Sequence, residues 1–93
     1  MPRGCPDCVR ALEELVQEIR TMATRDHLAS NVAAGMEKEL QAAIAESKKD
    51  FPDPKSILGK LDGAKTLLAG VAPASSLLNH FAETKTLITR YLP

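Results

Sequence analysis

The chain has 93 residues, enough for one domain and too few for two, so we expect a single domain over residues 1–93. Its formal net charge is zero, which argues against electrostatic binding of nucleic acid. Two Phe, one Tyr and no Trp leave Leu, Ala, Val and Ile to build the core, and this favours packed helices over a β-sandwich.

Charged residues interrupt every apolar run, so no segment predicts a membrane span. Glu13, Glu14 and Glu18 follow Arg3 too closely for a signal peptide. We therefore expect a cytoplasmic protein with reduced thiols.

The charge is unevenly distributed along the chain. Residues 1–54 hold seven basic and ten acidic residues, a net of −3, whereas residues 55–93 hold five basic and two acidic residues, a net of +3. The two halves could attract each other within one bundle, they could pair head to tail between two copies, or the split could have no consequence because salt screens such fields.

A first helix is predicted over residues 7–24. Asp7 is a residue type that caps the free amides at the start of a helix. Apolar residues then recur every three or four positions, in a stripe wider than a single seam. The central residues of this stripe are Leu12, Leu15, Val16, Ile19 and Met22.

A second helix is predicted over residues 28–49, after a break near Thr24–His27. Thr24 and Asp26 form caps more readily than helix interiors, which favours the break. The alternative is a long, continuous N-terminal helix plus a helical hairpin, completed by dimerisation. The expected buried face of the second helix contains Val32, Met36, Leu40, Ala43 and Ile44.

The clearest boundary in the chain is the sequence DFPDPKS. Asp53 and Pro54 form a ready N-cap and first helical residue. Phe51 is expected to fold back onto Ile57 or Leu58 as a hydrophobic staple.

A third helix is expected over residues 54–69, and a fourth over residues 74–92. Gly70 is expected to end the third helix and Pro73 to open the fourth. The apolar residues of the third helix are Ile57, Leu58, Leu61, Ala64, Leu67 and Leu68, and those of the fourth are Leu77, Leu78, Phe81, Ala82, Leu87, Ile88 and Tyr91. Short connections require antiparallel neighbours, so the predicted fold is an all-α, up-down four-helix bundle.

Residues 27–92 resemble helical modules found near the C-termini of many uncharacterised bacterial proteins. The resemblance lies in the Asp53-Pro54 turn, the Leu58–Leu68 helix, the small-residue turn AGVAPAS and the apolar helix Leu77–Leu92. It implies a bacterial accessory or oligomerisation module, and it carries over no catalytic residue.

Cys5 and Cys8 form a C-x-x-C pair at the start of the first helix, where the helix dipole and free amides would stabilise a thiolate. The strand and βαβ pattern of a thioredoxin-like protein are missing around the pair. A zinc site needs four ligands, and His27 and His80 are expected to lie far from the thiols. The two cysteines could therefore bind zinc only if two copies pooled them across a dimer axis, and the third possibility is that both are idle.

Histidine is a common general base, but no nucleophile or paired carboxylate accompanies His27 or His80 in the sequence. We therefore expect no enzyme. Gly59 and Gly63 are four residues apart within a predicted helix, where each costs helix stability. This spacing indicates that either the neighbouring helix or a partner lies close to the helix face that carries these glycines.

The function expected from the sequence is a non-enzymatic helical module for protein–protein interaction or oligomerisation, forming a homodimer. The apolar stripe of the first helix is its candidate interaction surface, although it can equally be that helix's core face. One alternative is a small regulator or inhibitor of a larger protein in bacterial defence or counter-defence. Another is a zinc-binding or redox protein that depends on the C-x-x-C pair.

Overall fold

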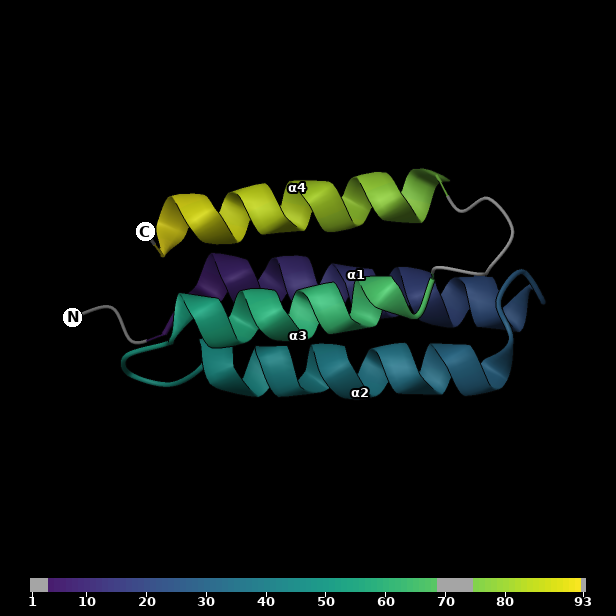
Figure 1. Cartoon of the computed structure of the whole chain (residues 1–93), viewed down its shortest axis with the longest axis horizontal. Coiled ribbons are helices and arrows are strands. Elements are labelled where there is room, and N and C mark those ends of the chain that lie inside the picture. Colours follow the sequence, from purple (N-terminus) through teal and green to yellow (C-terminus); the bar gives the residue numbers. More distant parts are fainter. Residues whose placement is uncertain (1–3, 69–74, 93) are drawn as a thin grey trace.

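The computed structural model describes residues 4–68 and 75–92, which form four α-helices and no strand. The helices are α1 (Pro6–Thr24), α2 (Ser30–Ser47), α3 (Pro54–Thr66) and α4 (Ser75–Tyr91). Both α1 and α3 contact α2 and α4, so the helices occupy the corners of a square. The chain runs up and down between these corners, and α1 begins at the end of the bundle where α4 ends (Figure 1). The predicted all-α four-helix bundle is confirmed.

One core runs along the inside of the bundle, and every helix contributes to it. Its largest fully buried side chains are Leu12, Leu15 and Ile19 of α1, Met36 and Leu40 of α2, Ile57 of α3, and Leu77, Phe81 and Ile88 of α4. The aliphatic core expected from the composition is thus present, with Phe81 as its aromatic member. Each helix can bury its apolar stripe only against the other three.

The start of α1 differs from the prediction. Its N-cap is Cys5, whose sulfur accepts a hydrogen bond from the Cys8 amide at 3.2 Å, and Asp7 lies one residue inside the helix. Pro6 explains the shift, because it has no N–H to satisfy and its fixed φ suits the first helical position. The predicted cap at Asp7 is wrong by two residues.

A true break separates α1 from α2, so the alternative of a continuous N-terminal helix is wrong. Asp26 has a left-handed φ of +63° and ends the helix. The His27 amide then donates to the Met22 carbonyl at 2.8 Å, and the Asp26 amide donates to the Ala23 carbonyl at 3.1 Å. This pair of bonds is the Schellman motif, which satisfies the last carbonyls of a helix. Leu28, buried after the turn, fixes the chain in its new direction.

Replacing Asp26 by Gly is expected to stabilise the protein by about 0.5–1 kcal/mol. Glycine adopts a left-handed φ at no steric cost, whereas Asp pays part of that cost in the folded state. Urea unfolding followed by circular dichroism measures the change. Asp26→Ala is the control and should lower stability, and a loss of stability in Asp26→Gly would contradict this account of the turn.

The junction between α2 and α3 is held by polar contacts. Asp53 caps α3 as predicted, accepting from the Lys55 amide at 3.0 Å. Its own amide donates to the Glu46 carboxylate at 3.1 Å, and Lys49 pairs with the same carboxylate at 3.0 Å. Phe51 is 93 % exposed, so the predicted staple is wrong. Ile57, its expected contact, faces the core instead.

From the contacts at this junction we predict that the stability of the fold depends on pH through the ionisation of Glu46. The hydrogen bond from the Asp53 amide, followed by the contact with Lys49, lowers the pKa of Glu46 below its ordinary value of 4.5. A lowered pKa in the folded state stabilises the fold above pH 4.5, and this contribution is lost as the pH falls through the folded-state pKa. Glu46→Gln should therefore lower stability at pH 7 and flatten the loss of stability below pH 4.5.

Urea midpoints at neutral and acid pH measure this effect. Glu13→Gln, at an exposed position of α1, is the matched control and should keep the wild-type acid response. An unchanged acid response in Glu46→Gln would show that the contacts at the junction contribute nothing to it.

The buried face of α4 is narrower than the predicted stripe. Leu77, Phe81, Thr84 and Ile88 are buried, while Leu78 and Tyr91 are 40 % and 52 % exposed. Thr84 is accommodated because its hydroxyl donates to the His80 carbonyl at 2.8 Å. Leu67, which follows the last residue of α3, is 42 % exposed. The predicted boundaries at Gly70 and Pro73 lie outside the described residues.

Candidate functional site

The apolar stripe of α1 is a core face and no surface for a partner. Leu12, Leu15 and Ile19 have no exposed area, Val16 is almost fully buried, and Met22 packs partly buried against the same core. In the folded bundle these five residues therefore form the core face of the helix, which is the alternative that the sequence left open. The stripe is wide because α1 contacts two neighbours, α2 and α4, and must cover both.

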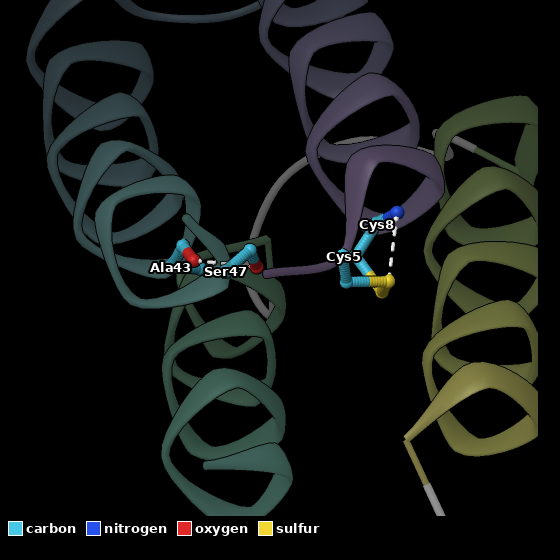
Figure 2. Close-up of a disulfide and its surroundings, with 4 residues drawn as sticks. All are labelled: Cys5, Cys8, Ala43 and Ser47. Atoms are coloured by element: carbon cyan, nitrogen blue, oxygen red, sulfur yellow. Dashed lines mark hydrogen bonds between the residues drawn. A yellow bond between two sulfur atoms is a disulfide. The ribbon is translucent and has the colours of Figure 1, made fainter. Parts of the chain in front are cut away.

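The C-x-x-C pair forms a disulfide at the start of α1. The two sulfur atoms are 2.04 Å apart, and the two Cα atoms are 5.2 Å apart (Figure 2). Sulfurs bonded to each other offer no thiolate to a metal, so the structure departs from the expected reduced thiols. Zinc binding by the reduced pair across a dimer stays a prediction. Within residues 4–68 and 75–92, no three His, Cys, Asp or Glu side chains gather as a metal site.

The disulfide end of α1 is clamped to the end of α2. The Cys5 amide donates to the Ser47 carbonyl at 2.8 Å, and the buried Ser47 hydroxyl donates to the Ala43 carbonyl at 2.8 Å. Figure 2 shows Ser47 beside the Cys5 end of α1. Gly4 has a φ of +72°, and a β-carbon there would lie 2.5 Å from the Ser47 carbonyl oxygen. Only glycine fits where the chain at Gly4 passes the Ser47 carbonyl without displacing the backbone.

The two histidines occupy separate and different settings. His80 of α4 places Nδ1 at 2.6 Å from the Glu18 carboxylate of α1, and both side chains are partly exposed. His27 lies exposed in the α1–α2 turn, where its backbone ends the helix. In the described part of the chain neither imidazole contacts a hydroxyl or thiol nucleophile, and His80–Glu18 is a link between α1 and α4.

A hollow of about 590 Å³ runs between α3 and α4. We call it the α3–α4 groove. It is lined by the apolar residues Leu58, Leu61, Phe81 and Ala82, and by Gly59, Asp62, Lys65, Lys85 and Thr86. Its volume is within the range of ligand-binding pockets, and its mixture of apolar and polar lining residues is typical of them.

The two glycines of α3 are in different environments. A β-carbon on Gly63 would lie 3.2 Å from the Glu39 carboxylate of α2, so Gly63 faces the neighbouring helix. A β-carbon on Gly59 would meet nothing within 4 Å, and Gly59 lines the groove. For Gly59, the prediction of close approach by the neighbouring helix is therefore wrong, and approach by a partner stays a prediction.

In the folded bundle the uneven charge of the sequence gives one acidic face and one basic face. Helices α1 and α2 carry seven acidic and three basic residues, a net of −4, and they are neighbours. Helices α3 and α4 carry five basic and two acidic residues, a net of +3, and they are neighbours on the opposite side. The groove therefore opens on the basic face of the bundle.

No protein-family model, curated protein or solved structure matches this chain. The helices within the described ranges include none that is long and apolar enough to cross a membrane.

Sequence reasoning missed the groove residues, because grooves arise where two helices face each other. Lys65 and Lys85 are 20 residues apart, and only the antiparallel pairing of α3 with α4 places both at one hollow. The one signal in the sequence was Gly59, a helix-weakening residue that no contact inside the bundle requires.

Proposed function

We propose that this protein is a non-enzymatic interaction module that binds an acidic, amphipathic helix of a partner protein in the α3–α4 groove. The observation that carries the proposal is the groove itself, a partly open hollow between two helices that is lined by apolar residues and by a lysine from each helix. Binding of an amphipathic helix in an apolar groove is a recurring mode of peptide recognition.

Charge favours an acidic occupant. Lys65 and Lys85 stand at the groove, and neither forms an ion pair with a described residue, while Asp62 is the one carboxylate among the lining residues. Complementary charge at a groove edge mainly raises the association rate and discriminates between partners. We expect each such pair to contribute about 0.2–1 kcal/mol, and less at high salt.

Gly59 favours a helix as the occupant. Its missing side chain lowers one wall of the groove and lets another backbone approach α3 closely. The substitution of a glycine in a helix interior by alanine gains about 1 kcal/mol in the absence of contacts, so Gly59 costs stability that the isolated bundle does not recover.

The test uses a designed amphipathic peptide of Leu, Ala and Glu, and a twin in which Lys replaces every Glu. Amide chemical shifts of the labelled protein are followed by NMR as each peptide is added. We expect the acidic peptide to shift amides of residues 58–65 and 81–86, and the basic twin to shift them far less. Gly59→Glu should abolish the response without unfolding the protein, because the new side chain enters open space.

Gln41→Glu is the matched control, since it adds the same charge at an exposed position of α2 on the acidic face. It should leave binding unchanged. Equal responses to both peptides, or shifts centred on α1 and α2, would contradict the proposal. A dimer that Gly59→Glu dissociates would place a second copy in the groove and favour the homodimer instead.

The remaining expectations from the sequence stay predictions. These are the bacterial and cytoplasmic setting, the homodimer, zinc binding by Cys5 and Cys8 across a dimer, and the role as a regulator or inhibitor of a larger protein. A module that binds one helix of a larger partner is compatible with the last of these.

A further inference from the structure

The two cysteines of the disulfide differ in their access to solvent, and this difference points to a role beyond the proposed interaction function. Cys8 is 0 % exposed and belongs to the core, whereas Cys5 is 6 % exposed and lines a surface hollow of about 380 Å³. Pro6, Val9 and Ser47 line the same hollow. A molecule approaching from solvent therefore meets Cys5 first.

Cys5 also has the better environment for a negative charge on sulfur. Its sulfur occupies the N-cap of α1 and already accepts a hydrogen bond from the Cys8 amide at 3.2 Å. The free amides and the positive end of the helix dipole stabilise a thiolate at this position. This stabilisation favours the release of Cys5 as a thiolate when a mixed disulfide on Cys5 is cleaved, whereas access from solvent selects Cys5 as the sulfur that is attacked first.

We propose that Cys5–Cys8 is a thiol–disulfide exchange site for small thiols, in which Cys5 is the attacked sulfur and Cys8 is the buried resolving sulfur. The thiolate of a small thiol attacks Cys5 Sγ, a mixed disulfide forms there, and the bond to Cys8 breaks. Cys8 Sγ leaves with the electron pair and takes up a proton. A second small thiol then attacks the first one and releases Cys5, so two thiols are oxidised to their disulfide as the protein disulfide is reduced.

In the opposite direction Cys8 resolves the mixed disulfide. Its thiolate attacks Cys5 Sγ, re-forms the protein disulfide and expels the small thiol. In the oxidised structure the Cys5 amide is hydrogen-bonded to Ser47 and Cys8 is packed in the core, and neither contact requires the S–S bond.

The experiment compares Cys8→Ser with Cys5→Ser, each treated with oxidised glutathione without denaturant and followed by intact mass. We expect Cys8→Ser to gain one glutathione, on Cys5, at least about ten times faster than Cys5→Ser gains one on Cys8. Circular dichroism checks that both variants are folded.

A measurement on the wild-type protein keeps the test independent of the variants. The oxidised protein is mixed with reduced glutathione, quenched with acid, and digested, and the mixed disulfide is mapped by peptide mass. We expect it on Cys5. A mixed disulfide mainly on Cys8, equal rates in the two variants, or reaction only in urea would overturn the proposal, as would air-purified protein with both thiols free.

Discussion

Ile19→Asp is expected to unfold the bundle. Ile19 has no exposed area and lies in the middle of the core face of α1. A carboxylate placed there without a partner costs several kcal/mol, which is comparable to the roughly 5–15 kcal/mol that stabilises a typical domain. The milder Ile19→Ala should lower the free energy of unfolding by about 2–5 kcal/mol, through lost burial and a residual cavity. Urea titration followed by circular dichroism measures both effects.

Gln17→Asp is the control, since Gln17 is exposed two residues earlier on the same helix. It should change stability by no more than about 0.5 kcal/mol. Light scattering on each variant separates unfolding from dissociation. A folded Ile19→Asp protein with an altered solution mass would show that the α1 stripe is a surface after all.

Gly4→Ala is expected to destabilise the protein by about 1–3 kcal/mol. Two costs add at this position, a left-handed φ of +72° and a β-carbon 2.5 Å from the Ser47 carbonyl oxygen. The obstacle is backbone, so it cannot rotate away. The loss of stability cannot exceed what the hydrogen bond between Cys5 and Ser47 and the nearby packing contribute. If the strain were larger, the segment around Gly4 would detach from the end of α2 instead. Urea unfolding of the oxidised protein measures it.

Gly59→Ala makes the same chemical change and should have the opposite effect. A β-carbon there meets no atom within 4 Å, so the substitution gains helix propensity, about 1 kcal/mol, without a clash. Gly4→Ala and Gly59→Ala thus serve as controls for each other, because they make the same substitution at a crowded and at an open position. Destabilisation by Gly59→Ala would show that α3 needs the glycine for its own packing, and would weaken the argument for a partner at the groove.

The candidate interaction surface lies between α3 and α4, whereas the sequence favoured the apolar stripe of α1. A wide apolar stripe on α1 and a partly open groove between α3 and α4 both provide apolar area. Burial decides between them, because Leu15 and Ile19 are closed off by α2 and α4, whereas Gly59 and Lys85 border open space.

Local chemistry explains which boundaries could be predicted. Asp53 and Pro54 start α3 as expected, because an acceptor side chain followed by a fixed φ suits one conformation almost regardless of context. The break at Asp26 was predictable for a similar reason, although its left-handed geometry was not. Cys5 as a cap was missed because sulfur is a weak acceptor that cap preferences rank low.

The spacing of apolar residues predicted which face of each helix is buried, but not which residues at the edges of that face are buried. Thr84 and Ser47 are buried although polar, since each hydroxyl bonds a carbonyl one turn earlier in its own helix. Phe51 is exposed although it is large and apolar, since the polar contacts of Glu46 and Asp53 close the turn without it. Such outcomes depend on the space left by neighbouring helices, which no pattern in a single segment records.

The sequence by itself determined that this protein is a small all-α bundle with four helices, because apolar spacing, caps and prolines act over a few residues. It also contained the charge difference between the two halves. The tertiary structure alone decided that the apolar stripe of α1 is covered by both α2 and α4, that Gly4 lies against the Ser47 carbonyl, and that Lys65 and Lys85 share one groove. These features require residues far apart in the chain to meet, and only the packing of four helices around one core brings them together.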